Sequence, residues 1–224
     1  MDVLKRVRGT IISTIIRDIP GKFWEDARAG TRRVYADSFE QIRADPNVVK
    51  EQRIDKLYQD RHFYMESLLQ KLAHVHGLEC SSTILIENGR SYVYATKGAV
   101  GLTQAYVPSI GTMPKPARFR ERHAALNSIP KAPRLELGDE PREVMLGKDC
   151  YGVLVHNPAG KRFSDQDQRL GMIQFCVPYC DCSGWAIELS IEEILYAYDA
   201  VALVKKKDRR LPWKKDAKQK GDQE

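Results

Sequence analysis

Two short β-type runs joined by an Asn-Gly pair are the feature that most restricts the fold of this chain. The runs are Thr83–Ile86 and Tyr92–Ala95, and Asn88-Gly89 lies between them. A type I′ turn needs positive φ at both central positions, and Asn followed by Gly tolerates this well. The pattern predicts an antiparallel hairpin, which Gln104–Pro108 continues as a third extended segment. The fold must therefore contain a sheet.

Apolar residues ahead of the hairpin recur at steps of three and four, which is the spacing of one helix face. Pro20 and Pro46 interrupt this pattern, and Gly77 supplies a stop signal. The region before the hairpin is therefore predicted to be helical, and its first part forms an N-terminal extension. The apolar stripes cover residues 3–16, 23–42 and 54–75.

The last of these stripes is long for a domain of this size. A helix of about 27 residues would extend roughly 40 Å, more than it needs to cover its own sheet. Long helices with such a stripe often continue into helix pairs. The pattern predicts a homodimer through residues 54–75. The alternative is that this helix is buried against residues 1–46.

The second half of the chain combines clear and ambiguous patterns. Tyr151–His156 indicates a strand, and Ser164 has the form of a helix cap followed by an acidic first turn. Residues 172–189 fit either a continuing helix or a hairpin, and both remain open at this point. Further helices are expected at Arg120–Asn127 and Ile191–Tyr198, the second with Ser190 as its cap and Glu192 and Glu193 in its first turn.

Together these patterns predict an α+β fold, a mainly antiparallel sheet with packed helices. The expected division has three parts: a helical N-terminal extension over residues 1–46, an α+β domain over residues 47–204, and a basic, disordered tail over residues 205–224.

Composition places the chain among folded soluble proteins. Hydrophobic residues make up 42% and charged residues 29%. The longest apolar runs are far shorter than the roughly 18 residues that span a bilayer, so no membrane span is expected. The N-terminal apolar stretch is broken by polar residues and does not indicate a secretory signal. Five cysteines, an odd number, indicate reduced thiols and a cytoplasmic location.

The formal net charge of +6 is concentrated at the end of the chain. Residues 205–224 contain nine Lys or Arg and four acids, so the rest is close to neutral. Such a tail is typical of a solvated end, and also of an arm that contacts nucleic acid or an acidic surface. The candidate contact residues are Lys205, Lys206, Lys207, Arg209 and Arg210.

The clearest cluster of reactive side chains consists of three cysteines. The sequence lacks a glycine-rich phosphate loop, His-Glu-x-x-His, Gly-x-Ser-x-Gly and Cys-x-x-Cys. Cys176, Cys180 and Cys182 could bind zinc as thiolates, with His156 or Cys150 as a fourth ligand. Buried core thiols and redox sensing are the alternatives.

Several segments follow one another in a recognisable order. Behind a long helix come CSSTILIENGRSYVYATKGAVGL at residues 80–102, QAYVPSIG, and YGVLVHNPAGKRFSDQDQRL at residues 151–170, in which Phe-Ser-x-x-Asp starts the closing helix. Over residues 52–189 this order resembles a GAF domain, a small-molecule-binding regulatory module. Residues 108–148 contain six of the eleven prolines and would form the roof of the domain. The resemblance implies a ligand cavity between the sheet and this proline-rich roof. The motifs of the cyclic-nucleotide-binding and bilin-binding members are absent, so it implies no particular ligand.

Four residues are the ligand-binding candidates in a GAF-like arrangement. They are Tyr94 and Tyr106 on the strands, Arg120 on the roof helix and Cys150 at the start of the returning strand. Tyrosine rings suit a planar or weakly polar ligand, and Arg120 would supply a counter-charge. The alternative is that both tyrosines fill a dry core and Arg120 is solvated.

The function expected on these grounds is a non-catalytic regulatory or sensory module in signalling that binds a small molecule, a protein partner or both. Two alternatives remain. One is a nucleic-acid-binding accessory protein that uses the basic tail. The other is a thiol- or metal-dependent enzyme that uses Cys150 or the Cys176–Cys182 cluster.

Overall fold

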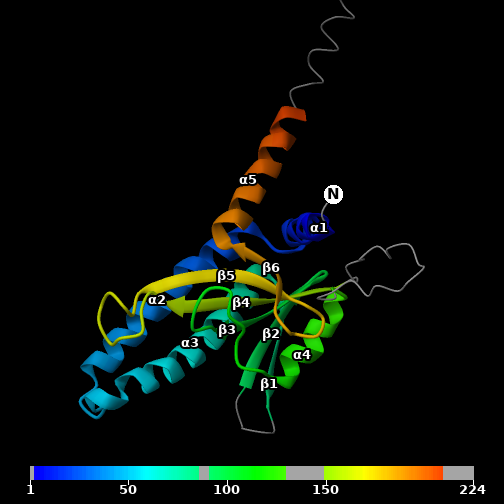
Figure 1. Cartoon of the computed structure of the whole chain (residues 1–224). Helices are drawn as coiled ribbons and strands as arrows, with labels where there is room; N and C mark the ends of the chain where they lie inside the picture. Colours follow the sequence, from blue (N-terminus) through cyan, green and yellow to red (C-terminus); the bar gives the residue numbers. More distant parts are fainter. Residues whose placement is uncertain (1–2, 86–90, 130–148, 209–224) are drawn as a thin grey trace, which may run out of the picture.

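The computed structural model describes residues 3–85, 91–129 and 149–208 of the chain (Figure 1). Within them, three helices precede a mixed region of strands, and a last helix follows it. The helices are α1 (Val3–Asp18), α2 (Gly21–Ala44), α3 (Arg53–His76), α4 (Arg118–Ala124) and α5 (Ile191–Asp208), with 3-10 turns η1 (Lys50–Gln52) and η2 (Ala125–Asn127). The strands are β1 (Glu79–Ile84), β2 (Ser91–Lys97), β3 (Val100–Tyr106), β4 (Cys150–Pro158), β5 (Leu170–Pro178) and β6 (Trp185–Ser190).

The six strands form one sheet whose spatial order follows the sequence. Neighbouring strands are antiparallel, except that β3 and β4 run parallel. A parallel pair needs a long crossover connection, which here includes α4 and η2. The sheet is therefore two three-stranded meanders joined by one parallel pair. This architecture confirms the α+β class with a mainly antiparallel sheet.

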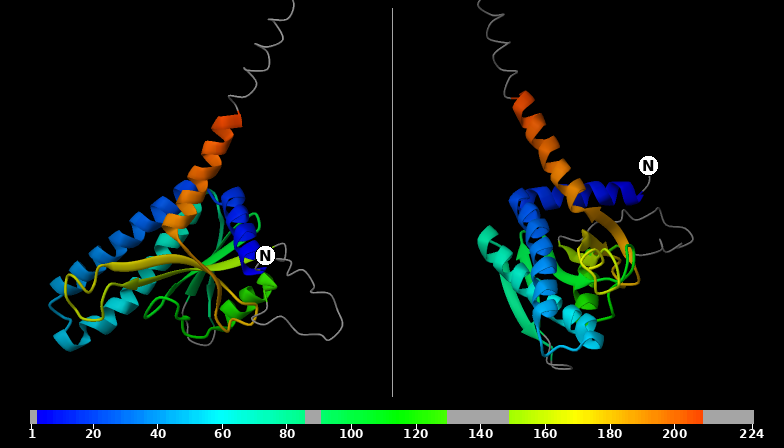
Figure 2. Two further views of the ribbon diagram at one scale, coloured as in Figure 1. Left: turned by 45° about the horizontal axis from the view of Figure 1, so that its top comes forward. Right: turned by 90° about the vertical axis from the view of Figure 1, so that its left-hand side faces the viewer.

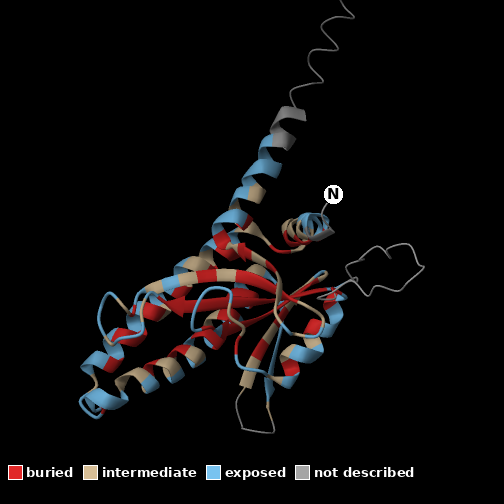
Figure 3. Ribbon diagram, in the orientation of Figure 1, coloured by how far each residue is buried: buried red, intermediate tan, exposed pale blue. Residues whose placement is uncertain are grey.

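Helices cover both faces of the sheet, but unequally (Figures 1 and 2). Helices α1, α2, α3 and α5 share one buried cluster with Val93, Leu154 and Phe175 of the sheet. The opposite face carries a smaller cluster in which Ala124, at the end of α4, packs near Tyr151. Because side chains alternate along a strand, β3, β4 and β5 each place buried residues in both clusters. Buried residues accordingly concentrate at the sheet and at the inner sides of the helices (Figure 3).

The first two helices belong to the same core as the sheet. Ile11, Ile15, Phe23 and Trp24 are fully buried in the larger cluster. The Trp24 ring meets the Phe175 ring edge to face, with centroids 5.4 Å apart. Helices α1 and α2 are thus tied closely to the sheet, and the domain boundary expected at residue 46 stays a prediction.

Two local signals of the sequence take their expected geometry. Gly77 ends α3 with a φ of 66°, and the N–H of Leu78 donates to the carbonyl of Ala73 at 2.8 Å. This is the left-handed cap for which glycine is preferred. At α5, the N–H of Glu193 donates to the Ser190 hydroxyl at 3.1 Å, and the Ser190 N–H donates to the Glu193 carboxylate at 3.0 Å. The two residues form a capping box.

The predicted hairpin is confirmed by pairing of β1 with β2, from Glu79↔Thr96 to Ile84↔Ser91. The Asn88-Gly89 pair itself lies outside the described residues.

The helix predicted to start at Ser164 is not formed. The Asp167 N–H does donate to the Ser164 hydroxyl at 3.2 Å, but β5 begins at Leu170 after a single turn. The physical reason is that the carbonyls that would continue a helix are taken: those of Asp167 and Arg169 accept from the N–H groups of Gly160 and Ala159, and that of Gln168 accepts from Arg61. Beyond it, β5 and β6 pair through Phe175↔Leu189. Residues 172–189 are therefore a hairpin, one of the two alternatives that their pattern left open.

Most of the apolar stripe on α3 is covered inside the chain. Leu57, Met65, Leu69 and Leu72 are buried, mainly against α2 and the sheet. Among the apolar residues of the stripe, Val75 is the one that is strongly exposed, at 71%. This is largely the burial against residues 1–46 that the sequence offered as an alternative, and the homodimer through residues 54–75 stays a prediction.

Helix α5 leaves the body of the molecule, and its C-terminal half stands clear in each view (Figures 1 and 2). Tyr196 and Leu203 on this helix are 76% and 60% exposed. None of the described helices contains an apolar stretch of the length that a bilayer span requires.

Candidate functional site

Five polar side chains are buried where α2 and α3 pack on β3 and β4. These residues form a buried polar network, and Arg61, Glu66, Gln104 and His156 in it are 2%, 7%, 3% and 1% exposed. Buried polar groups are costly unless their hydrogen bonds are satisfied. At this site, hydrogen-bonded polar side chains therefore take the place of apolar packing in the core. Its members are Tyr35, Arg61, Glu66, Gln104 and His156.

Arg61 holds the outer end of the network through neutral partners. Its guanidinium donates to the Ser38 hydroxyl at 3.1 Å and to the Tyr35 carbonyl at 3.2 Å. It also donates to the side-chain oxygen of Gln168 at 2.7 Å and to its backbone carbonyl at 2.9 Å. The guanidinium lies 4.0 Å from the centre of the Tyr35 ring. Burial lowers the pKa of Arg61 to about 10, so it still carries its charge at neutral pH.

His156 connects the helices to the sheet and has a defined tautomer. Its Nε2 lies 3.0 Å from the Gln104 side-chain oxygen, and its Nδ1 lies 2.8 Å from the Tyr35 hydroxyl. Because the Gln104 oxygen can only accept, Nε2 carries the proton and Tyr35 donates to Nδ1. Burial lowers the pKa of His156 to about 3, which agrees with a neutral ring.

Glu66 occupies the inner end of the network, between β2 and β3. One carboxylate oxygen accepts from the Gln104 amide at 2.6 Å, and the other accepts from the Val93 backbone N–H at 2.7 Å. The Gln104 amide also lies 3.2 Å from Nδ1 of His62. Burial raises the pKa of Glu66 to about 7, although the two hydrogen bonds and the charge of Arg120 act in the other direction. Glu66 is therefore poised to change its protonation near neutral pH.

A pair of aromatic side chains lies between the buried polar network and the protein surface. The rings of Tyr58 on α3 and Tyr106 on β3 lie 5.0 Å apart, and the Tyr106 ring lies 6.4 Å from that of His156. Tyr106 remains 37% exposed. A molecule that binds to Tyr106 would therefore be separated from the buried His156 only by the Tyr106 ring.

The four ligand-binding candidates do not converge on one cavity. Tyr94 and Arg120 lie on the α4 side of the sheet, whereas Tyr106 and Cys150 lie on the side of α1, α2 and α3. On the α4 side, the Tyr94 ring stacks on His123 at 4.0 Å. The arrangement expected from the sequence is thus divided by the sheet into two separate surfaces.

On the α4 side, aromatic rings fill the space next to Arg120. Its guanidinium lies 4.8 Å from the Phe119 ring centre and donates to the Lys115 carbonyl. Phe119 in turn stacks on Tyr92 with ring centroids 3.9 Å apart. Burial lowers the pKa of Arg120 and of His123. Tyr94 thus lies in a packed aromatic layer.

The cysteine cluster is not assembled as a metal site. Among the described residues, no group of three or more His, Cys, Asp or Glu side chains could hold a metal ion. Cys176 is buried in the smaller core, whereas Cys180 and Cys182 are half-buried in the β5–β6 turn. Both nitrogens of His156 are taken by Tyr35 and Gln104, so this ring offers no free ligand atom. Cys150 is buried in the larger core, where burial raises its pKa to about 12.

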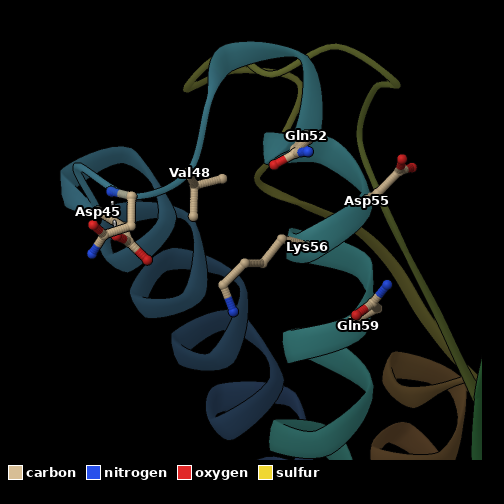
Figure 4. Close-up of a pocket in the computed structure, with 7 residues that line it drawn as sticks. Asp45, Val48, Gln52, Asp55, Lys56 and Gln59 are labelled. Carbon is tan, nitrogen blue, oxygen red and sulfur yellow. Dashed lines mark hydrogen bonds between the residues drawn. The ribbon is translucent and has the colours of Figure 1, made fainter.

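Two surface hollows lie away from these residues. The larger, about 460 Å³, opens beside the α2–α3 connection and is lined by polar side chains that include Asp45, Gln52 and Lys56 (Figure 4). The second, about 380 Å³, lies between α2 and α3 around Val34 and Leu68. Neither is lined by a ligand-binding candidate.

The basic contact candidates are only partly described. Lys205, Lys206 and Lys207 belong to the last turns of α5. Arg209 and Arg210 lie outside the described residues.

Sequence reasoning missed the buried polar network, although one signal was present. Arg61 and Glu66 interrupt the apolar stripe of α3 at positions that its spacing directs inward, next to Leu57 and Met65. A charged residue inside such a stripe indicates a buried partner. Nothing in the local sequence, however, identifies Gln104 and His156 as the residues that meet them.

The fold and this network define an α+β protein with a buried ionisable centre beneath a mixed sheet. No family model matches the chain, and comparisons with curated proteins and with solved structures gave no significant similarity.

Proposed function

We propose that this chain is a non-catalytic regulatory module that binds a small molecule or a protein side chain at Tyr58 and Tyr106. The carrying observation is that the half-exposed Tyr106 ring lies against both Tyr58 and the buried His156. Binding at this pair would change the environment of a network that joins two helices and two strands. The GAF-like order of motifs suggests the same class of function, although its closing helix is not formed here.

The chemistry of the pair favours a planar, weakly polar ligand. Two tyrosine rings present apolar faces with hydroxyl groups at their edges. Burial and a side-chain hydrogen bond with Tyr58 raise the pKa of Tyr106. Its hydroxyl is therefore protonated at neutral pH and could exchange Tyr58 for an acceptor on the ligand. The bound group would therefore combine an aromatic or flat face with at least one acceptor.

Native mass spectrometry of the purified full chain tests this proposal, because it reports bound small molecules and oligomeric state together. The wild type and Tyr196→Ala, a change at an exposed tyrosine on α5, should carry the same co-purified molecule. Tyr106→Ala should lose at least tenfold in occupancy. Equal occupancy in all three proteins would contradict binding at this pair. The proposal would also be contradicted if the wild type carried no bound molecule and no planar metabolite raised its melting temperature.

The second candidate function is nucleic-acid binding, which one observation favours. Helix α5 projects from a nearly neutral body and ends with Lys205, Lys206 and Lys207. An arm of this kind could contact phosphates without interference from the body. Affinity for duplex DNA or RNA should then fall steeply with salt, and deletion of residues 205–220 should abolish it. Salt-independent binding, or binding unchanged by the deletion, would exclude this function.

The proposal extends to location and assembly. The five cysteines are all free thiols in the structure. In a cytoplasmic protein they would stay reduced. A homodimer through residues 54–75 would use the exposed Phe63, Tyr64 and Val75 of α3. The native mass spectra would report this dimer directly.

A further inference from the structure

The ladder between β2 and β3 stops early, and its end lies at Glu66. The two strands pair at Lys97↔Val100, Thr96↔Gly101 and Ala95↔Leu102. By contrast, β1 follows β2 along its length to Ser91, and β4 follows β3 to Tyr106. In the same register, the next partners would be Tyr94↔Thr103 and Val93↔Gln104. These residues are described, yet they are not paired.

Backbone directions show that Val93 and Gln104 would form the next hydrogen-bonded pair. The Val107 N–H donates to the His156 carbonyl at 3.1 Å, so odd-numbered residues of β3 direct their backbone groups toward β4. Successive residues alternate, and Gln104 therefore directs its backbone groups toward β2. The Val93 N–H likewise points into the opening, because it donates there to Glu66.

The Glu66 carboxylate thus occupies the place of a backbone pair. It accepts the Val93 N–H that would otherwise reach the Gln104 carbonyl, and it accepts the Gln104 side-chain amide as well. Hydrogen bonds to a charged carboxylate are roughly twice as strong as those between neutral groups. A protonated carboxyl has only one good acceptor oxygen and cannot serve both donors equally well.

We propose that Glu66 is a proton-controlled wedge: its charged carboxylate keeps β2 apart from β3, and its protonation lets the two strands pair through Val93 and Gln104. This inference concerns the chain alone and does not depend on a ligand at Tyr58 and Tyr106. The pKa of Glu66, raised by burial to about 7, places the change close to neutral pH.

Four other titratable groups surround Glu66. On its own helix, His62 bonds to the Gln104 amide. From β4, His156 stays neutral because burial lowers its pKa to about 3. From α4, the charge of Arg120 lowers the pKa of Glu66, and from β1 Cys80 has its pKa raised by burial and by Glu66. Only protonation of Glu66 removes the acceptor that holds Val93.

Nuclear Overhauser contacts on the full-length chain test the wedge. In an extended ladder, Tyr92↔Ala105 is a pair without mutual hydrogen bonds, so its α-protons come close. The wild type should show the contact between these α-protons at pH 5.5 and lose it at pH 8.5. Glu66→Gln, which mimics the protonated carboxyl, should show it at both pH values. Asp55→Asn, an exposed carboxylate on the same helix, should behave as the wild type.

A wild-type contact that is the same at both pH values would overturn the proposal. A Glu66→Gln protein with the wild-type pH response would also overturn it, because the response would then belong to another group such as His62. If this variant does not fold, a measurement on the wild type alone tests the proposal. Its Val93 amide and Gln104 side-chain resonances must titrate with the same midpoint as the contact, and a different midpoint rejects the wedge.

Discussion

The Tyr35 hydroxyl donates a hydrogen bond to Nδ1 of His156 over 2.8 Å, across 121 residues of sequence. Both residues are almost completely buried, and their rings meet edge to face with centroids 5.7 Å apart. This contact joins the middle of α2 to the centre of the sheet. It completes the histidine tautomer that the Gln104 oxygen sets, so the helical layer and the sheet share one polar arrangement.

Removal of the Tyr35 hydroxyl should destabilise the protein without changing its shape. Tyr35→Phe leaves Nδ1 of a buried, neutral histidine without a donor, which typically costs about 1–3 kcal/mol. Urea denaturation followed by circular dichroism would measure this loss. Tyr64→Phe is the matched control, since the Tyr64 hydroxyl donates to Gln41 at the exposed surface. A control that loses as much as Tyr35→Phe would contradict the role of burial.

Arg61 should be needed for the loop between β4 and β5. Arg61→Met keeps most of the buried stem but leaves the Ser38 and Gln168 oxygens without their donor, so we expect a loss of about 3 kcal/mol or more. Arg32→Met on α2 removes an exposed guanidinium and should cost less than about 1 kcal/mol. Hydrogen exchange should also rise around Gln168 only in the first variant. Unchanged exchange there would show that the loop is held by other contacts.

The stability of the wild type should depend on pH through Glu66. Its pKa lies near 7 in the folded chain and near 4.5 as an ordinary side chain, so the folded state binds more protons between these values. The free energy of unfolding should therefore fall as the pH rises from about 4.5 to about 7, and stay lower above that.

Glu66→Gln lacks this titration. The stability of the variant relative to the wild type should therefore improve by on the order of 3 kcal/mol between pH 4.5 and pH 8. Urea titrations of both proteins across this range measure the difference. A difference that does not change with pH would show that Glu66 is ionised normally in the fold.

Gly152 should tolerate no side chain. A Cβ at this position would lie 2.1 Å from the edge of the buried Phe175 ring, which has no free space to move into. Gly152→Ala should destabilise the protein by about 1–3 kcal/mol through overpacking. Gly9→Ala in α1 meets no atom within 4 Å and should instead stabilise it by about 0.5–1 kcal/mol. Thermal unfolding of the two variants should therefore shift in opposite directions.

Thiol reactivity should follow burial rather than sequence clustering. Cys80 lies on the exposed strand β1 and should react first with a thiol reagent, and Cys80→Ser should remove this fast phase. Cys150 and Cys176 are buried, and burial raises the pKa of both thiols. They should react only as fast as the protein unfolds. Rapid reaction of Cys176 together with Cys180 and Cys182 would contradict this order and would favour a functional cysteine cluster.

The sequence by itself determined the elements whose signals are local. The three- and four-residue spacing, the Gly77 cap, the Ser190 capping box and the β1–β2 hairpin depend on residues close in the chain. Such signals act through backbone conformation and through neighbouring side chains, so they can be found without knowing the fold. From them the α+β class and most helix positions follow.

Tertiary structure decided the parts that rest on distant partners. Ser164 begins a turn with a helix-like cap, but the bonds from Arg61 to Gln168 end it. The predicted ligand residues Tyr94 and Tyr106 lie on adjacent strands, and only the register of the sheet places them on opposite faces.

The buried polar network is the strongest case. Arg61 and Glu66 interrupt the apolar stripe of α3, which indicates that they need partners but not which ones. Gln104 and His156 become part of the network because β3 packs on α3 and β4 runs parallel beside β3. The energy of a buried charge depends on all the dipoles that fold around it, and that environment exists only once the helices have packed on the sheet.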